Sequence, residues 1–372
     1  MQPGTRVAAG ACIVCNGTAR TVLARGGRDS PSLTTVACDG CGMVSHHPLP
    51  DPVQVAAFYE REYRMAYKGA WDPKPKHALR AQRGAIARAR RLLPLLPPAG
   101  RVLDIGASSG EFTYVMSRLG HEASGMEPNR AYAAFARRTY GAAVQEGGYE
   151  AAPAIDGGYH LITLNHVLEH LPDPGAALAR FHALLAPDGL LFLEVPNLLG
   201  VRKRAATLFH TAHIWNFTPQ TLAALAARHG FAPEPGQDLA ETSLVFRRLP
   251  APVAAAADPG LAARLRAQVA TDQRSLAYLL SGAPFLRRWH RLCRNIEEQL
   301  TLRRHPGLRE MADALLEAAF PPTAPLRRAP APPRRTGHLA PLSARLGAAS
   351  APRRVLQSPY ATPRNTPAPP PP

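Results

Sequence analysis

Between residues 100 and 250, short apolar runs alternate with longer stretches in which apolar residues recur every three or four positions. The runs have the length of buried strands, and the stretches between them have the period of amphipathic helices. Strands that alternate with helices are typical of a parallel α/β sheet. We therefore expect an α/β fold whose strands include RVLDIG, HEASGMEP, YHLITLN, GLLFLEV and ETSLVFRRL.

The segments outside this region have different patterns. Residues 1–50 are rich in Gly, Cys, Thr and Pro and lack helical periodicity, which indicates a small loop-and-strand module. Residues 51–98 predict a helical linker or lid, and residues 251–320 predict a helical extension broken at Pro284 and Pro306. In residues 321–372, 15 of 52 positions are Pro and one is aromatic, so we expect a disordered tail.

Charge and composition narrow the class of protein. The 372 residues are 46% hydrophobic, enough for a sizeable core, and the formal net charge is +17. Only 4 of the 44 cationic residues are Lys, and about half of the excess charge lies in the tail. Such Arg abundance can reflect genomic base composition, so we do not expect nucleic acid as the partner. No apolar run approaches ~20 residues and no signal peptide is visible, which predicts a cytoplasmic protein without a membrane partner.

Four of the five cysteines form two C-x-x-C pairs, Cys12 with Cys15 and Cys38 with Cys41. The two intervening residues let both sulfurs of a pair face one ion, and four thiolates can surround Zn²⁺ tetrahedrally. Such a closed site has no open position for substrate, so we expect a structural zinc ion. The alternative is a redox dithiol, which two pairs in one short module make the weaker interpretation.

The stretch LDIGASSG follows an apolar run and precedes a helical stretch. Gly106 and Gly110 allow a tight turn and the close approach of a ligand to the backbone. Asp104 lies within the strand, and Glu127 ends the next strand, where a carboxylate can accept both hydroxyls of a ribose. Ser108 replaces the middle Gly of a pyrophosphate-binding loop, which favours a cofactor with a ribose and an amino-acid end but no phosphates. A dinucleotide loop and an ordinary turn remain the alternatives.

These residues carry a family resemblance. In this order, LDIGASSGEF, GMEPN, LNHVLEHLPDP and LLAPDGLLFLEVPN resemble the class I S-adenosylmethionine-dependent methyltransferases. The resemblance implies a Rossmann-like sheet of seven strands over residues 99–250. The Cys pairs followed by HHPLPDPVQVAAFYEREY resemble the zinc-binding preface of methyltransferases from sugar and natural-product pathways, some of which methylate carbon of deoxysugars. HTAHIWNFTPQTLAALAARHGF is similar to the late region of these enzymes and of ubiquinone-biosynthesis O-methyltransferases.

The resemblance also implies roles for individual residues. Glu127 would bind the ribose diol, and Asn165 and His166 would close the pocket after the fourth strand. Gln145 and Glu146 are weaker candidates for the adenine edge. The residues implied to bind S-adenosylmethionine are Asp104, Gly106, Ser108, Gly110, Glu127, Asn165 and His166.

Methyl transfer from a sulfonium needs an aligned nucleophile and a group that takes its proton. Ligands of open α/β sheets lie at the carboxyl ends of strands, which is where His170 is expected. We predict His170 as the first candidate base, oriented by Glu169, and His213 as the second. Alternatively, Glu169 and His170 belong to a helix cap around Pro172, and His213 is a buried histidine bonded to backbone.

The acceptor is expected to be a small molecule, namely a sugar, free or nucleotide-linked, a glycan or a related metabolite. In sugar C-methyltransferases a Glu typically precedes the late His, and here that position is Ala212, which favours a hydroxyl acceptor at least as much as carbon. Tyr63 and Tyr67 are expected to form a lid. The Arg-rich stretch 77–91 predicts a solvated face or, alternatively, a contact to a phosphorylated acceptor.

Two other functions stay open at this point. An RNA-directed methyltransferase could use the Cys module and the arginines to grip a backbone, although no N/D-P-P-Y/F motif follows the fourth strand. An inactive cofactor-binding scaffold could use residues 251–320 to hold partner enzymes. The same residues could instead make a homodimer.

Overall fold

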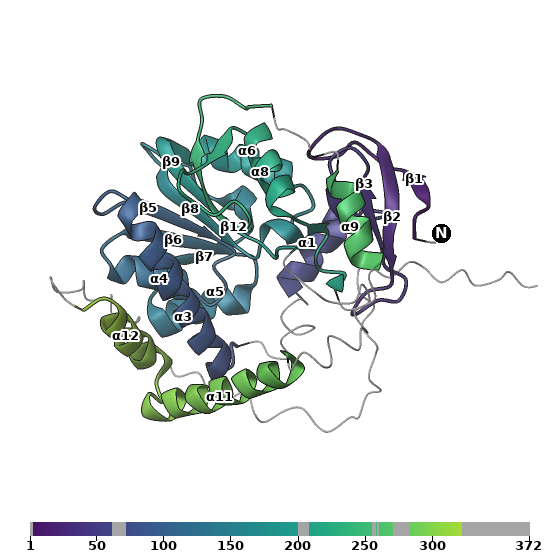
Figure 1. The fold of residues 1–372 in the computed structure, drawn as a ribbon. Helices are drawn as coiled ribbons and strands as arrows, with labels where there is room; N and C mark the ends of the chain where they lie inside the picture. The colour runs from purple at the N-terminus through teal and green to yellow at the C-terminus, as the bar shows by residue number, and fades with distance from the viewer. Residues whose placement is uncertain are drawn as a thin grey trace, which may run out of the picture.

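The computed structural model describes residues 3–61, 72–199, 208–254, 258, 260–270 and 283–321. They form two sheets with helices packed around them (Figure 1). The strands are β1 (Arg6–Ala8), β2 (Ala19–Arg25), β3 (Thr34–Cys38), β4 (Val44–His46), β5 (Arg101–Ile105), β6 (Glu122–Glu127), β7 (Val144–Glu146), β8 (Tyr159–Asn165), β9 (Leu185–Glu194), β10 (Trp215–Asn216), β11 (Phe231–Pro233) and β12 (Ser243–Arg248). The α-helices are α1 (Pro52–Arg61), α3 (Pro75–Leu92), α4 (Glu111–Arg118), α5 (Arg130–Tyr140), α6 (Pro174–Leu184), α8 (Pro219–Arg228), α9 (Leu261–Ala270), α11 (Ala283–Arg304) and α12 (Leu308–Ala319). Short 3₁₀ turns cover Leu93–Leu95, Tyr149–Ala151 and Leu168–His170.

The larger sheet has seven strands in the order β11-β12-β9-β8-β5-β6-β7. Strands β5 to β9 run parallel, and β12 runs antiparallel to both of its neighbours. The chain order reverses between β5 and β8, and a ligand crevice is expected at the carboxyl ends of the strands there. The predicted Rossmann-like sheet of seven strands is therefore confirmed.

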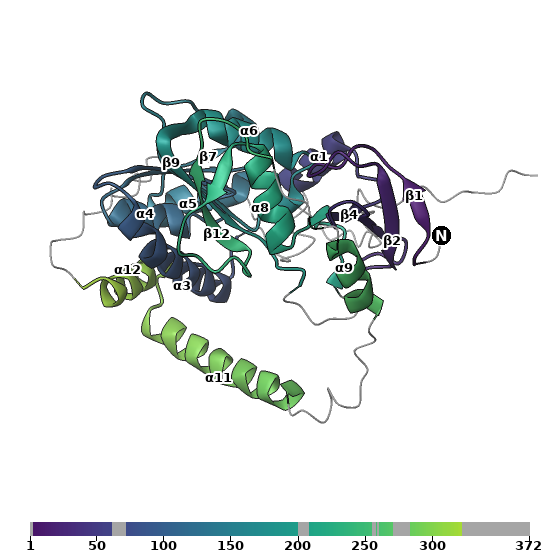
Figure 2. The same ribbon diagram turned by 45° about the horizontal axis from the view of Figure 1, so that its top comes forward.

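Helices cover both faces of this sheet, as a parallel sheet requires (Figure 1 and Figure 2). Neighbouring residues of β5 face opposite sides, so Val102 packs with Ile86 of α3, whereas Leu103 packs in the cluster that contains Leu178 of α6. Helix α12 adds Leu316 to the first of these clusters. Both faces of the sheet are thus closed to water by apolar side chains.

The smaller sheet has the order β1-β2-β3-β4-β10 and is antiparallel. Its last strand, β10, lies far along the sequence and pairs Trp215 with Ser45 and Asn216 with Val44. Apolar residues of the N-terminal part, such as Met43, share one core cluster with Phe217 and with the α/β sheet. The N-terminal strands are therefore bonded to the segment that follows β9.

The C-terminal helices pack on different parts of the molecule. Helix α9 packs on the smaller sheet, where Leu261 and Leu265 contact the cluster around Leu23. Helix α11 begins with Pro284 in its first turn, and Pro306 separates it from α12, as the sequence pattern predicts. In the described parts of the chain, no helix is long and apolar enough to cross a bilayer. Tyr63, Tyr67 and residues 322–372 lie outside the described residues.

Candidate active site

A cavity of about 990 Å³ lies at the carboxyl ends of β5, β6 and β8, where the switch in strand order places it. Seven of the predicted site residues line it: Gly106, Ser108, Glu127, Asn165, His166, His170 and His213. Glu146, the weaker adenine candidate, lines it as well. These predicted residues, from Gly106 to His213, are up to 107 positions apart in the sequence and line one cavity.

The backbone conformation of the bend after β5 requires a glycine at position 106. Gly106 has a φ of 70°, and a Cβ there would lie 2.4 Å from Cγ2 of Val167. Ser108 also has a positive φ, 54°, which is uncommon for a residue with a side chain. Its backbone N–H donates to Oε2 of Glu127 at 2.8 Å. The bend and the end of β6 are therefore joined by a direct hydrogen bond.

Glu127 is buried at the end of β6, with 3% of its surface exposed. Its second oxygen, Oε1, accepts from the backbone N–H of Asn129 at 3.0 Å. Two backbone donors thus hold the carboxylate in one orientation at the cavity wall.

Two predicted cofactor residues do not line the cavity. Asp104 is fully buried beneath the bend and accepts from Oγ1 of Thr163 at 2.7 Å. Burial raises the pKa of Asp104 to about 6. Gly110 has a φ of 87° and lies where a Cβ would come within 2.6 Å of Cβ of Ala136, so it permits α4 and α5 to approach. Both residues therefore lie behind the cavity wall and contribute to the packing around the bend.

After β8, three histidines surround one carboxylate. Oε1 of the buried Glu169 lies 3.4 Å from Nδ1 of His166, 3.7 Å from Nε2 of His170 and 3.8 Å from Nε2 of His213. The carboxylate raises the pKa of His166. Burial, with His170 and His210 close by, lowers the pKa of His213, so that ring is neutral at physiological pH.

The tautomer of His170 follows from its hydrogen bond. Nδ1 lies 2.6 Å from the carbonyl oxygen of Ala212, and because a carbonyl can only accept, Nδ1 carries the proton. Nε2 of a neutral His170 then holds a lone pair and can take a proton. The capping interpretation of Glu169 and His170 does not apply, because Asp173 caps α6 by accepting from the N–H of Ala176.

Residues 77–235 match the family described as a methyltransferase domain. This region is therefore similar to methyltransferase domains, in keeping with the resemblance of its motifs to the class I S-adenosylmethionine-dependent enzymes.

Among curated proteins, the methyltransferase domain is similar to ubiquinone biosynthesis O-methyltransferases. That of Xanthomonas campestris pv. campestris (strain B100) is 32% identical over 137 residues, which are 34% of this chain and 56% of that protein. That of Thiobacillus denitrificans is 28% identical over 158 residues, 40% of this chain and 64% of that protein. The chain spans little more than half the length of the first of these relatives.

Two solved structures are similar to the chain at low identity. An amino pentose methyltransferase from Micromonospora echinaspora, involved in calicheamicin biosynthesis, is 20% identical over 51% of this chain and 98% of that chain, with a TM-score of 0.38. A 1,6-didemethyltoxoflavin-N1-methyltransferase from Burkholderia thailandensis is 23% identical over 61% of this chain and 100% of that chain, with a TM-score of 0.42. At these values neither structure bears on the substrate.

Beside the methyltransferase domain, the four cysteines of the N-terminal strands converge. Sγ of Cys12 lies 3.6 Å from Sγ of Cys41, and Sγ of Cys15 lies 3.5 Å from Sγ of Cys38. Sulfurs bound to one tetrahedral zinc ion at about 2.3 Å lie about 3.8 Å apart, so the set fits Zn²⁺ with little movement. Asn16, with a φ of 60°, forms the turn after the first pair.

A second group of donors in the methyltransferase domain meets the distance requirement for a metal ion. One ligand atom each from Glu169, His170 and His213 lies within 4.8 Å of the others. Histidine and carboxylate ligands suit several divalent ions. The same three residues are the predicted catalytic ones, so ion binding and proton transfer would compete for Nε2 of His170.

The segment that carries His213 is held by the N-terminal strands. Asp29 accepts from the N–H of Thr211 at 3.0 Å and from its hydroxyl at 2.8 Å. Just before it in the sequence, the N–H of Arg28 donates to the carbonyl oxygen of Phe209 at 2.8 Å. The N–H of His46 donates to the carbonyl oxygen of Ile214 at 3.0 Å. The N-terminal strands therefore position one wall of the methyltransferase cavity.

Several lining residues were not predicted from the sequence. Pro52 and Val55 come from α1, and Tyr149, Glu150 and Asp173 come from the segments after β7 and β8. The acid and aromatic in the short GGYE stretch were the only sequence signal for Tyr149 and Glu150. Nothing in the local pattern of α1 distinguishes a cavity wall from an ordinary helix.

Proposed function

We propose that this protein binds S-adenosylmethionine between the bend after β5 and Glu127 and transfers its methyl group to a small-molecule acceptor. We propose a hydroxyl or carbon of a sugar, a glycan or a natural-product intermediate as the acceptor atom. The observation that carries the proposal is that one cavity connects Gly106, Ser108 and Glu127 with His170 and His213.

The cofactor half of the cavity has the chemistry that this ligand needs. The oriented carboxylate of Glu127 can accept hydrogen bonds from both ribose hydroxyls while it holds the N–H of Ser108. Gly106 leaves the backbone open to the ligand, and Glu146, at the end of β7, is available for the adenine amino group. Asn165 and His166 close the pocket from the end of β8. When bound, S-adenosylmethionine supplies a methyl group on a sulfonium, which is already activated for displacement.

His170 is the proposed general base. Nε2 of His170 would take the proton that the acceptor hydroxyl gives up when it is methylated. Glu169 stabilises the imidazolium that results, at 3.7 Å from Nε2. The lowered pKa of His213 makes it the weaker proton acceptor, so its proposed part is a hydrogen bond to the acceptor.

The position before His213 favours the hydroxyl acceptor over carbon. Ala212 offers only its carbonyl oxygen, and that atom holds Nδ1 of His170. The carboxylate of Glu169 lies 3.8 Å from Nε2 of His213. A single histidine is enough to take the proton of a hydroxyl, whereas carbon methylation also requires stabilisation of a developing enolate.

We further propose one structural Zn²⁺ on Cys12, Cys15, Cys38 and Cys41. The support is the close approach of the four sulfurs, which leaves no ligand position for a substrate. The division of the chain into modules at residues 50, 98, 250 and 320 also stays a proposal.

A methyl-transfer assay with labelled cofactor tests the catalytic part. With a panel of hydroxylated aromatic acids and nucleotide-linked sugars, we expect turnover that His170→Ala lowers by roughly 10²- to 10⁴-fold. The affinity for S-adenosylhomocysteine should stay within about threefold of the parent, because His170 lies on the acceptor side. His229→Ala, a change at the end of α8, is the matched control. Full activity of His170→Ala would refute the assignment of the base.

A further inference from the structure

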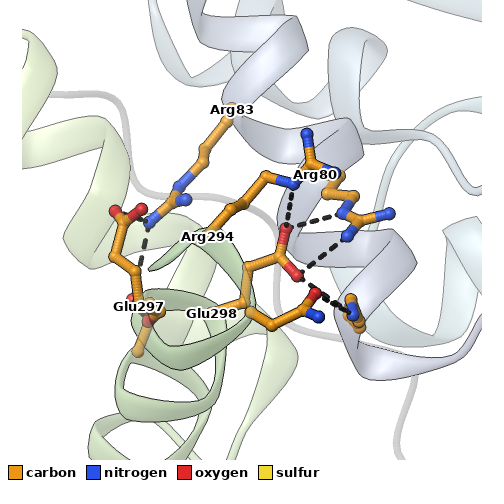
Figure 3. Close-up of polar contacts among 8 residues, drawn as sticks. Arg80, Arg83, Arg294, Glu297 and Glu298 are labelled. Atoms are coloured by element: carbon orange, nitrogen blue, oxygen red, sulfur yellow. Dashed lines mark hydrogen bonds and ion pairs between the residues drawn. The ribbon is translucent and has the colours of Figure 1, made fainter. Parts of the chain in front are cut away.

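Helix α11 docks on the methyltransferase domain through charged side chains. Glu298 is 1% exposed and accepts from Nε of Arg80 at 2.6 Å and from its Nη2 at 3.0 Å. Glu297 accepts from Nη2 of Arg83 at 2.8 Å. Figure 3 shows these side chains pointing toward one another from α3 and α11. Two arginines of the Arg-rich helix α3 are therefore engaged in ion pairs with α11.

The other side of α11 is apolar and exposed. Trp289, Leu292, Ile296 and Leu300 are 54%, 50%, 53% and 47% exposed. Their spacing of three, four and four residues places them on one face, which we call the outer stripe. Glu298 follows Ile296 by two positions and so lies on the opposite face. The acid Glu298 is thus buried against α3, whereas the large apolar side chains of the outer stripe face solvent, unlike those of an ordinary surface helix.

Most of the charges that remain accessible on α11 are positive; Glu297 is exposed but pairs with Arg83. Arg288, Arg291, Arg303 and Arg304 are exposed. The two acids of the helix, Glu297 and Glu298, both pair with arginines of α3. An apolar stripe accompanied by cations is complementary to a partner that is apolar and anionic.

We propose that the outer stripe of α11 lies on an anionic lipid surface and holds the protein there peripherally. Amphipathic helices that bind the membrane interface combine Trp, Leu or Ile on one face with Arg or Lys beside it. The chain contributes a formal net charge of +17, which strengthens attraction to anionic lipids. The ion pairs with α3 leave the apolar face free to enter the boundary between headgroups and acyl chains.

A second copy of the chain fits the stripe less well. Because exposed arginines outnumber the one exposed acid of α11, Glu297, two stripes in contact would bring arginines of both copies together, and both copies carry the same net charge. A stable protein interface also uses about 20 to 30 residues a side, whereas the stripe offers four large side chains over three turns. Figure 1 and Figure 2 both place α11 at the periphery of the molecule, where a flat surface can reach it.

Lipid binding of this kind differs from the spanning helix that the sequence excludes. A bilayer-crossing helix needs ~20 apolar residues, whereas an interfacial helix needs only one apolar face. The proposal is independent of the methyl-transfer activity, because no described residue of α11 lines the cavity.

Flotation of the full-length protein with vesicles tests the proposal. We expect binding to vesicles of phosphatidylcholine with phosphatidylglycerol and little binding to phosphatidylcholine alone. The double variant Leu292→Gln/Ile296→Gln should weaken the binding by on the order of tenfold or more, because two aliphatic side chains no longer enter the interface. Leu49→Gln/Leu239→Gln, which changes two equally exposed apolar residues elsewhere, is the matched control and should bind as the parent does.

Other outcomes would overturn the proposal. If the stripe variant and the control bind equally, the attraction comes from charge alone and the stripe is not the contact. If the parent does not bind vesicles but sediments as a dimer, and the stripe variant sediments as a monomer, a second copy covers the stripe. If neither occurs but the stripe variant lowers the melting temperature, another segment of the same chain covers it. Affinity for S-adenosylhomocysteine, measured on each variant, verifies that the fold is intact.

Discussion

Two residues with side chains adopt left-handed backbone conformations at the cavity. Ser108 and His166 both have a φ of 54°, and both line the hollow. Such conformations cost on the order of 1–3 kcal/mol and persist where the surrounding structure fixes them. The N–H of Ser108 is directed to Glu127 and that of His166 to the carbonyl oxygen of Glu194. The sequence identified both residues, but their strain follows only from the folded backbone.

The Glu127 carboxylate should dominate cofactor affinity among single side chains. Glu127→Ala removes a buried acceptor that holds the bend and, in our proposal, the ribose. Loss of charged hydrogen bonds worth about 1.5–3 kcal/mol corresponds to roughly 10- to 100-fold weaker binding of S-adenosylhomocysteine. Isothermal titration measures this, with Glu122→Ala at the exposed start of β6 as the control. Unchanged affinity of the Glu127 variant would contradict the ribose assignment.

His46 should make the fold less stable in acid. Burial lowers its pKa to about 4 from an ordinary value near 6.5. Below pH 6.5, His46 binds a proton in the unfolded chain but stays neutral in the folded chain. The free energy of unfolding therefore decreases as the pH falls from 6.5 toward 4. From pH 7.5 to pH 5 this group alone removes about 2 kcal/mol of the free energy of unfolding.

Urea unfolding of the parent and of His46→Asn at both pH values measures this effect. The variant should lose less stability between the two conditions, whatever its absolute stability. His210, whose pKa burial also lowers to about 4, acts in the same sense and leaves part of the dependence in place. An identical acid-induced loss in both proteins would contradict the assignment to His46.

At the scale of elements, long apolar runs were predictable and very short strands were not. The five runs found in the sequence are β5, β6, β8, β9 and β12. Strands β7 and β11 have three residues each and β10 has two, which is too few to show a period. Trp215 of β10 is buried, at 5% exposure. Its pairing with β4 depends on contacts across about 170 residues of sequence, which local patterns do not encode.

This long-range pairing has a functional consequence that can be measured. Asp29→Ala removes both hydrogen bonds to Thr211 and frees the segment that carries His213 and the carbonyl oxygen of Ala212. Misplacement of catalytic groups by about 1 Å can cost 10²-fold, so we expect kcat to fall roughly 10- to 100-fold. Affinity for S-adenosylhomocysteine should hold, because the segment faces the acceptor side.

Asp29→Asn is the conservative companion of this variant. Its amide oxygen can still accept from the N–H of Thr211, so it should recover part of kcat. Asp156→Ala, in the loop before β8, is the surface control. Equal loss of cofactor affinity and turnover in Asp29→Ala would indicate general unfolding instead of positioning.

At the scale of the whole molecule, the two halves of the site differ in how much of each can be predicted from the sequence. The cofactor half is built from consecutive strand ends, so Gly106, Ser108 and Glu127 follow from motif order alone. The half that we propose for the acceptor combines α1 with the segment of His213, which only the fold brings together. Sequence motifs predict the first half because its residues are close in sequence. They do not predict the second half, whose residues are far apart in sequence.

Removal of metal should affect the entire molecule because the N-terminal strands share a core with the α/β sheet. We expect one zinc ion per chain by elemental analysis. Cys41→Ser should lower the free energy of unfolding by more than about 4 kcal/mol, since metal binding in such sites contributes directly to folding. Cys293→Ser, which changes the exposed cysteine of α11, is the matched control. A metal-free parent with unchanged stability would contradict a structural zinc site.

The crystal structure of the full-length protein with S-adenosylhomocysteine tests the central claim most directly. We predict density for the nucleoside between the backbone of Gly106 to Ser108 and the carboxylate of Glu127, with both ribose hydroxyls on that carboxylate. The sulfur should face the side of the cavity where His170 and His213 lie. A ligand bound elsewhere, or a cavity that stays empty at saturating concentration, would contradict the account.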